Sequence, residues 1–152
     1  MKDKKEIVIA LRIAIIIFAL VGVAFCAYWV PASIIKPNAV VPWLEAALYW
    51  VCSAPCFVIL ILAWDVTNQF AEGNFFDVHS AKDILLAAWL LGIDSVLFIV
   101  GNVLTYFLKP NGYEFLYWVL GVAGACLSIL FLAISRYVKA AALIKEENEA
   151  IV

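Results

Sequence analysis

Long apolar segments dominate the pattern along this chain. Four of them, at about residues 7–30, 43–66, 84–108 and 115–138, could each cross a hydrocarbon layer of ~30 Å, which takes about 20 helical residues. None of the four alternates apolar and polar residues with period two, so helices are predicted rather than barrel strands. Turn-forming residues mark the breaks at Pro31, Pro42, Pro110 and Gly112. The pattern therefore predicts four transmembrane helices.

Composition supports the same class of protein. The chain has 152 residues, of which 67% are hydrophobic and 14% charged, and a domain of this size cannot bury that much apolar surface in one soluble core. No segment has the composition of a separate soluble domain or of a low-complexity linker. We therefore expect one transmembrane domain over residues 1–152, ending in a short cytoplasmic helical tail at residues 139–152.

The basic residues predict the orientation of the helices. One side of the predicted membrane would carry eight of them, namely Lys2, Lys4, Lys5, Arg12, Lys82, Arg136, Lys139 and Lys145. The other side would carry two, Lys36 and Lys109. Because basic residues favour the cytoplasmic side, we predict an all-α integral membrane protein, an antiparallel four-transmembrane-helix bundle with N and C termini cytoplasmic.

The residues that usually carry chemistry are scarce. The chain has no glycine-rich phosphate loop and no Ser, His and Asp set at one depth, so we expect no enzyme activity. The four cysteines lack histidine or carboxylate partners at ligand spacing, and the single histidine, His79, lies in a predicted cytoplasmic loop. We therefore expect no cofactor and no metal. A net charge of −2 also argues against direct contact with nucleic acid.

Two ionisable residues fall inside the predicted spans. Arg12 is near the cytoplasmic end of its helix, so it can extend toward the interface, where Asp65 is a plausible partner. Asp94 has no such escape, because about ten residues, some 15 Å of helix, separate it from the cytoplasmic end of its span. A charged group facing lipid at that depth would cost about 2.5 to 3.5 kcal/mol. We therefore expect Asp94 to face the interior of the protein.

Asp94 begins a stripe of polar residues along the third helix. At 100° per residue it shares one face with Thr105, and Ser95 and Asn102 lie beside them. If Glu45 and Tyr49 of the second helix face this stripe, the six residues form a polar pocket open to the outside. An equally weighted alternative is a protonated Asp94 that hydrogen-bonds Ser53 or Ser128 and holds the helices together.

Small residues follow one face of the fourth helix. Gly121, Gly124, Ala125 and Ser128 would let a neighbouring helix approach closely. The neighbour can be another helix of the same chain, which we favour, or the same helix of a second copy. The second possibility makes this face a candidate interface for a homo-oligomer.

Two cytoplasmic elements are candidates for docking a partner. The central loop contributes Phe75, Phe76, Ser80 and Lys82, and the tail contributes Glu147, Asn148, Ile151 and Val152. The tail has good helix formers, with Lys145 and Glu149 four residues apart, and it ends on two apolar residues after an acidic patch. We expect the tail to pack near the loop or to bind a partner, and the alternative is a solvated helix end.

The four-span layout, the loop around Gly73, Phe76, Ser80 and Lys82, and the tail "ALIKEENEAIV" resemble the bacterial membrane family called domain of unknown function 2975. Genes of that family often lie beside small helix-turn-helix regulators. The resemblance implies a non-enzymatic protein of the bacterial cytoplasmic membrane that senses a condition and controls a small cytoplasmic transcription regulator. The alternative is a binding or transport protein for a small solute, a lipid or protons, using the pocket at Asp94.

Overall fold

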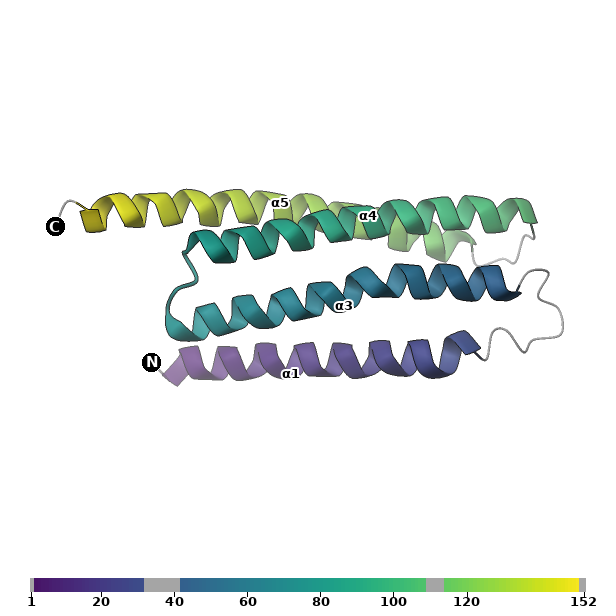
Figure 1. Cartoon of the computed structure of the whole chain (residues 1–152), viewed down its shortest axis with the longest axis horizontal. Helices are drawn as coiled ribbons and strands as arrows, with labels where there is room; N and C mark the ends of the chain where they lie inside the picture. The colour runs from purple at the N-terminus through teal and green to yellow at the C-terminus, as the bar shows by residue number, and fades with distance from the viewer. Residues whose placement is uncertain (1, 32–41, 109–113, 151–152) are drawn as a thin grey trace.

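The computed structural model describes residues 2–31, 42–108 and 114–150, and these residues form helices joined by one described turn (Figure 1). Helix α1 (Lys2–Ala24) continues into a π-helical turn, η1 (Phe25–Trp29). Three longer helices follow: α3 (Pro42–Glu72), α4 (Val78–Leu108) and α5 (Glu114–Ala150). No strand occurs in these ranges, which confirms the all-helical prediction.

Within the described ranges, four helices are long and apolar enough to cross a membrane. Three of them also extend well beyond the expected spans, since α3 reaches Glu72, α4 begins at Val78 and α5 continues to Ala150. The end of α3 has a glycine cap: Gly73 has φ +91°, its N–H donates to the Phe70 carbonyl at 3.2 Å, and the Asn74 N–H donates to the Gln69 carbonyl at 2.9 Å. Glycine accepts this left-handed backbone without steric cost, so the helix stops there and the chain turns directly into α4.

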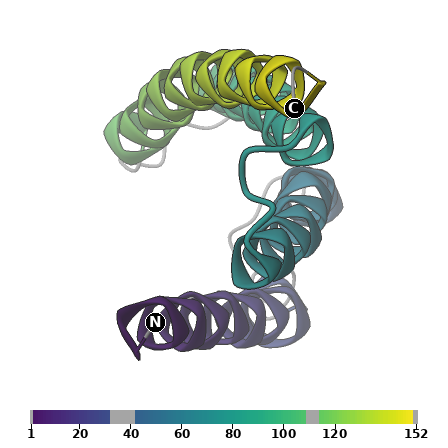
Figure 2. The ribbon, with the colours of Figure 1, turned by 90° about the vertical axis from the view of Figure 1, so that its left-hand side faces the viewer.

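The helices form an open row instead of a closed bundle. Figure 2 shows them along an arc in chain order, with α1 at one end and α5 at the other. The packing is most extensive between α4 and α5, less so between α3 and α4, and least between α1 and α3. Among the described helices, α1 and α5 do not meet. Each described helix thus contacts only its neighbours in the chain, and the antiparallel arrangement across a membrane stays a prediction. Large apolar side chains surround α1, and in lipid such side chains give little drive to associate with another helix.

Small residues, most of them seven positions apart, line the contact between α4 and α5. We call it the small-residue seam; it comprises Ala81, Ala88 and Ser95 of α4 with Gly121, Gly124, Ser128 and Ser135 of α5. The Ser135 hydroxyl donates to the Ala81 carbonyl at 2.7 Å, and the Ser128 hydroxyl donates to the Ala88 carbonyl at 2.8 Å. As the residue number rises by seven on α5, it falls by seven on α4, so the two helices run antiparallel and keep the same alignment along the seam.

Glycines allow the two backbones of the seam to approach closely. A Cβ atom at Gly121 would lie 2.8 Å from Ile99 Cγ1, and one at Gly124 would overlap the Ser95 hydroxyl. The stripe of small residues on α5 is thus in contact with α4 of the same chain. Dimerisation through Gly121, Gly124, Ala125 and Ser128 stays a prediction, and it would have to displace α4.

Candidate functional site

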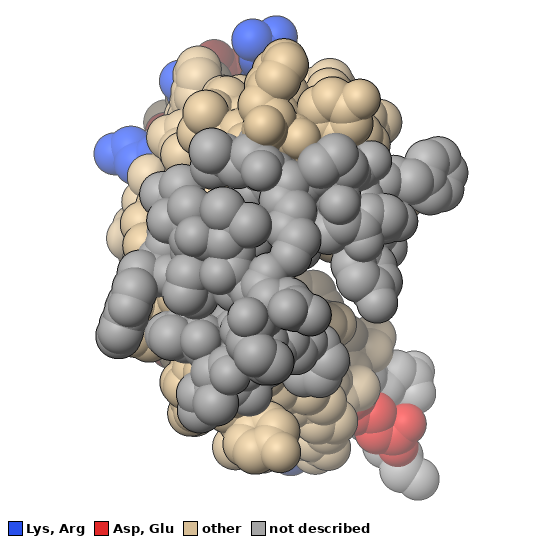
Figure 3. Space-filling model, turned by 90° about the vertical axis from the view of Figure 1, so that its right-hand side faces the viewer, with Lys and Arg blue, Asp and Glu red and all other residues tan. Residues whose placement is uncertain are grey.

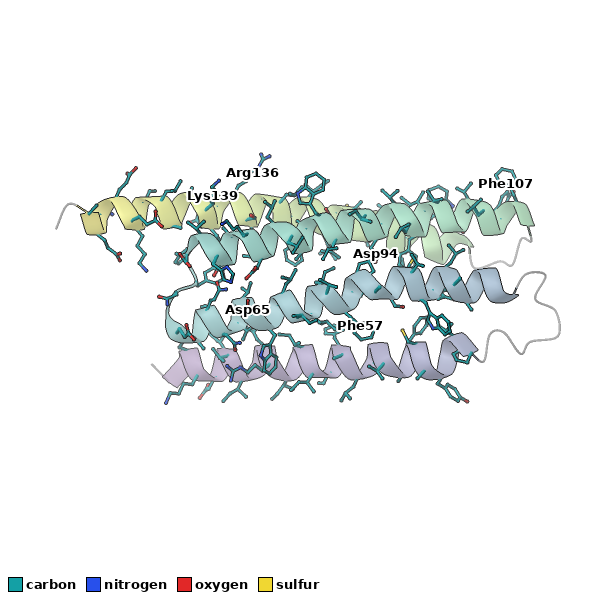
Figure 4. The ribbon with its side chains drawn as sticks, in the orientation of Figure 1. Phe57, Asp65, Asp94, Phe107, Arg136 and Lys139 are labelled. Atoms are coloured by element: carbon teal, nitrogen blue, oxygen red, sulfur yellow. The ribbon has the colours of Figure 1, made fainter. Side chains whose placement is uncertain are left out.

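Asp94 lies near the middle of α4 on the side that faces α3 (Figure 4). It is 7% exposed. Its Oδ2 atom accepts a hydrogen bond from the Cys56 thiol at 3.6 Å, and the same thiol lies 3.6 Å from the Cys52 carbonyl one turn back along α3. The carboxylate is therefore held at a helix–helix contact, with sulfur as its partner.

One oxygen of Asp94 has no hydrogen-bond partner in the described part of the chain. This atom, Oδ1, is buried. The serines expected as partners donate elsewhere: Ser53 donates to the Tyr49 carbonyl at 2.6 Å, and Ser128 donates to the Ala88 carbonyl. Hydrogen-bonding to Ser53 or Ser128 is thus wrong for this structure, because Asp94 Oδ2 pairs with the Cys56 thiol and Oδ1 pairs with neither serine.

The described residues of the predicted polar pocket lie at different places along the helices. Ser95 is next to it in sequence but faces α5, where its hydroxyl donates to the Leu91 carbonyl at 2.7 Å and lies against Gly124. Asn102 is buried two turns further along α4, and half-buried Tyr49 packs edge-on against Phe25 with ring centroids 6.0 Å apart. The side chains of Glu45 and Thr105 lie outside the described residues. Asp94 and Ser95 therefore belong to different helix interfaces, and ligand binding at this place stays a prediction.

Arg12 connects α1 to α3 through different residues from the one expected. Its Nη2 donates to Asn68 Oδ1 at 2.9 Å, and its guanidinium lies over the Trp64 ring, 5.4 Å from the centroid. The expected pairing with Asp65 is wrong, because Asn68 lies one helical turn nearer the end of α3 and meets the guanidinium while Trp64 covers it. Asp65 therefore does not pair with Arg12 of α1, and its carboxylate can interact with α4 instead.

The candidate docking loop is partly structural. Phe75 stacks edge-on against Phe70 and Phe76, and Phe76 remains exposed. Ser80 is fully buried, and its hydroxyl donates to the Gln69 side-chain oxygen. Lys82 is exposed. Of the four expected docking residues in this loop, Phe76 and Lys82 offer substantial surface, whereas Ser80 helps to join α3 to α4.

The described end of α5 stands clear of the other helices. Every residue from Leu143 to Ala150 is exposed, and Figure 1 shows this part of α5 extending past the start of α4. Glu147 and Asn148 lie on this extension, and Lys145 and Glu149 form an i, i+4 pair at 4.0 Å. The described tail does not pack onto the central loop, so of the two expected arrangements this one is wrong. Ile151 and Val152 lie outside the described residues.

A cluster that the sequence analysis missed lies where α3 ends and α4 begins. Asp65 of α3 meets His79 and Asp83 of α4, and one potential ligand atom from each lies within 4.8 Å of the other two. The available signal was the spacing of His79 and Asp83, which are four residues apart and share a helix face once α4 begins at Val78. The predicted third helix begins only at about residue 84, which leaves His79 in a loop, where this spacing has no structural meaning.

These features are consistent with a multi-pass helical membrane protein: among the described residues, four helices are long enough to cross a membrane, and large apolar side chains are exposed along them. The chain belongs to the family of proteins of unknown function called DUF2975, whose model matches residues 27–152. The resemblance noted in the sequence is thereby confirmed. The match begins within η1 and so includes α3, α4 and α5 but leaves out α1. Neither a curated protein nor a solved structure matches the chain.

Proposed function

We propose that this chain crosses the bacterial cytoplasmic membrane four times in alternating directions, with both termini in the cytoplasm. The eight-to-two distribution of basic residues supports this orientation. Both marked chain ends lie at the same end of the molecule in Figure 1, and the labelled Asp65, Arg136 and Lys139 lie toward that end in Figure 4. The described surface at the opposite end is mostly uncharged (Figure 3).

Reporter fusions test this topology. Fusions at Asn38 and Asn111 should report an external location, and a fusion after Val152 should report a cytoplasmic one. A cytoplasmic signal from Asn38 or Asn111 would contradict the proposed orientation.

We further propose that the protein is a non-enzymatic interaction protein that controls a small cytoplasmic helix-turn-helix regulator. The observation that carries this proposal is the exposed end of α5 from Leu143 to Ala150. It presents apolar Leu143 and Ile144 together with an acidic patch at Glu146, Glu147 and Glu149. An exposed helix that carries both apolar and acidic side chains can bind a partner protein through both kinds of contact.

Deletion of residues 146–152 tests the role of the tail. The deletion should abolish co-purification of the proposed helix-turn-helix regulator, while the shortened chain still inserts into the membrane. The charge reversals Glu146→Lys and Glu147→Lys should weaken capture without shortening the helix. Glu6→Lys is the matched control, because Glu6 is an exposed carboxylate on α1. Capture that survives the deletion would refute the proposal.

A second candidate function rests on Asp94. Few buried polar atoms in proteins lack a hydrogen-bond partner, and ionisable residues inside membrane helices commonly mark functional sites. Asp94 Oδ1, which is buried and has no partner within the described residues, therefore points to a functional role. In this alternative Asp94 binds or relays a small solute, lipid or proton. Asp94→Asn keeps the shape and removes titration, so it should preserve the fold but abolish substrate-linked proton movement in liposomes. If Asp94→Asn and Asp94→Leu both match the parent in stability and transport, this candidate is excluded.

A further inference from the structure

The cluster of Asp65, His79 and Asp83 has the composition and spacing of a metal-binding site. We propose that these three side chains bind one divalent first-row transition metal ion, with Zn²⁺ as the best-fitting representative. The ion would bridge the end of α3 and the first turns of α4. This proposal does not depend on the proposed partner or on Asp94, which lies elsewhere along α4.

The distances fit ligands around one ion better than they fit hydrogen bonds. His79 Nε2 lies 3.6 Å from Asp65 Oδ2 and 3.6 Å from Asp83 Oδ2. An N–H···O hydrogen bond is shorter, at about 2.7–3.2 Å. Two ligand atoms 3.6 Å apart that each lie about 2.1 Å from a shared ion subtend about 118°, close to a tetrahedral angle. All three ligand atoms lie within 4.8 Å of one another, so only small side-chain rotations are needed to bring them onto one ion.

The helices hold two of the ligands in place before any ion binds. His79 and Asp83 are separated by four residues on α4, so their side chains lie one above the other on the same face. Asp83 is 9% exposed, and its Oδ2 accepts a hydrogen bond from Gln69 Nε2 at 3.2 Å. Gln69 is in turn held by the Ser80 hydroxyl. Metal ligands are commonly oriented by outer hydrogen bonds of this kind.

The third ligand is free to complete the site. Asp65 has no other ion pair in the described part of the chain, because Arg12 bonds to Asn68 instead. The Asp65 and His79 side chains are 53% and 61% exposed, which leaves an open side from which an ion and a water ligand can enter. Three protein ligands with one open position form a common zinc arrangement.

The donor set also predicts which ions bind. One imidazole nitrogen and two carboxylate oxygens suit Zn²⁺, Co²⁺ and Ni²⁺, whereas Ca²⁺ and Mg²⁺ prefer six or more oxygen ligands. The four cysteines lie away from this cluster, so no thiolate should take part. Co²⁺ is a useful probe because its visible d–d bands report coordination, and a near-ultraviolet sulfur charge-transfer band would reveal thiolate binding.

Metal titration of the full, tag-free chain in detergent tests the proposal. One Co²⁺ per chain should bind with visible d–d bands and no sulfur charge-transfer band, Zn²⁺ should displace it, and excess Mg²⁺ should not. Gln69→Ala removes only the hydrogen bond that orients Asp83 and should weaken Zn²⁺ binding roughly 10–100-fold. Asp65→Asn and His79→Gln each remove a direct ligand and should weaken Zn²⁺ binding more than that. Asp77→Asn, an exposed carboxylate beside the cluster, is the matched control and should leave the affinity unchanged.

Three outcomes would overturn the proposal: no Co²⁺ binding by the folded chain, binding that His79→Gln leaves intact, or a sulfur charge-transfer band. The first would mean that His79 is simply an imidazole between two carboxylates. Helix content measured by circular dichroism shows whether each variant is folded. Because Asp83 also bonds to Gln69, the decisive variants are those at the more exposed Asp65 and His79.

Discussion

The two outermost helices of the row are attached in very different ways. At one end, α5 packs along α4 through the small-residue seam, and its buried serines donate to carbonyls of the facing helix. At the other end, α1 lies against α3 alone among the described helices, and Val8 is the one buried residue among its described side chains. Both helices are strongly apolar. Hydrophobicity therefore does not explain the difference between them.

The comparison shows that side-chain size and placement decide which helices associate closely. In lipid, a leucine gains little by leaving the acyl chains for another helix, whereas glycine, alanine and serine let two backbones approach and hydrogen-bond. The seam repeats such residues every seven positions on both helices. Helix α1 offers a few separate contacts instead: Arg12 with Asn68 and Trp64, and Gly22 against the tip of the Phe57 ring. The family match, which leaves out α1, falls on the same division.

The largest effect should follow from filling the seam. Gly124→Ala places a methyl group on the Ser95 hydroxyl, which cannot move without losing its bond to the Leu91 carbonyl. We expect the free energy of unfolding to fall by about 1–3 kcal/mol, the usual cost of overpacking. Unfolding in mixed micelles of increasing dodecyl sulfate content measures this change.

A second substitution makes that test specific. Ser95→Ala removes the overlapping oxygen and leaves its Cβ 3.6 Å from the new methyl carbon, so the double variant should recover most of the lost stability. Gly101→Ala is the control, since its methyl would meet Leu48 at an ordinary 3.7 Å. If Gly124→Ala and Gly101→Ala behave alike, close approach does not distinguish this seam.

Loss of the main polar contact of α1 should have a smaller and more local effect. Arg12→Ala removes the bond to Asn68 and the stacking on Trp64, together worth about 1 kcal/mol at a partly exposed site. We expect α1 to loosen, so that Cys26 reacts faster with a membrane-permeant maleimide. Cys126, exposed on α5, should keep its rate. Equal acceleration at both cysteines would show that α1 supports the whole row, contrary to the comparison.

The smallest effect should come from one hydroxyl of the seam. Ser135→Ala removes the bond to the Ala81 carbonyl but keeps the side chain small, so close packing is retained. Hydrogen bonds between membrane helices are worth about 0.6 kcal/mol on average, and we expect a loss of that size. The dodecyl sulfate titration measures it, with Ser53→Ala, whose hydroxyl bonds within α3, as the matched control. A loss above that of Gly124→Ala would mean that polar bonding, rather than close approach, stabilises the seam.

Much of the secondary structure was predictable from local pattern. Long apolar runs predict the four spans because backbone groups in lipid must bond within their own helix. The end of α3 and the start of α4 were underestimated, because each of these helices was equated with its apolar part, whereas a helical tail was predicted after residue 138. Polar residues such as those from Lys139 to Ala150 also form helix when propensity is good and no breaker intervenes. Gly73 is the breaker that ends α3, and only Gly73 among the described residues has a left-handed backbone.

The sequence by itself determined the apolar spans, the buried position of Asp94 and the small-residue stripe on α5, because each depends on spacing along a single helix. The tertiary structure decided which helices meet and therefore which side chains become partners. Asp94 pairs with Cys56 instead of a serine, Arg12 with Asn68 instead of Asp65, and Asp65 with His79. Such pairings depend on the rotation and relative height of two helices, to which a shift of one residue adds about 100° and 1.5 Å. Periodicity within one helix carries no information about the height of its neighbour.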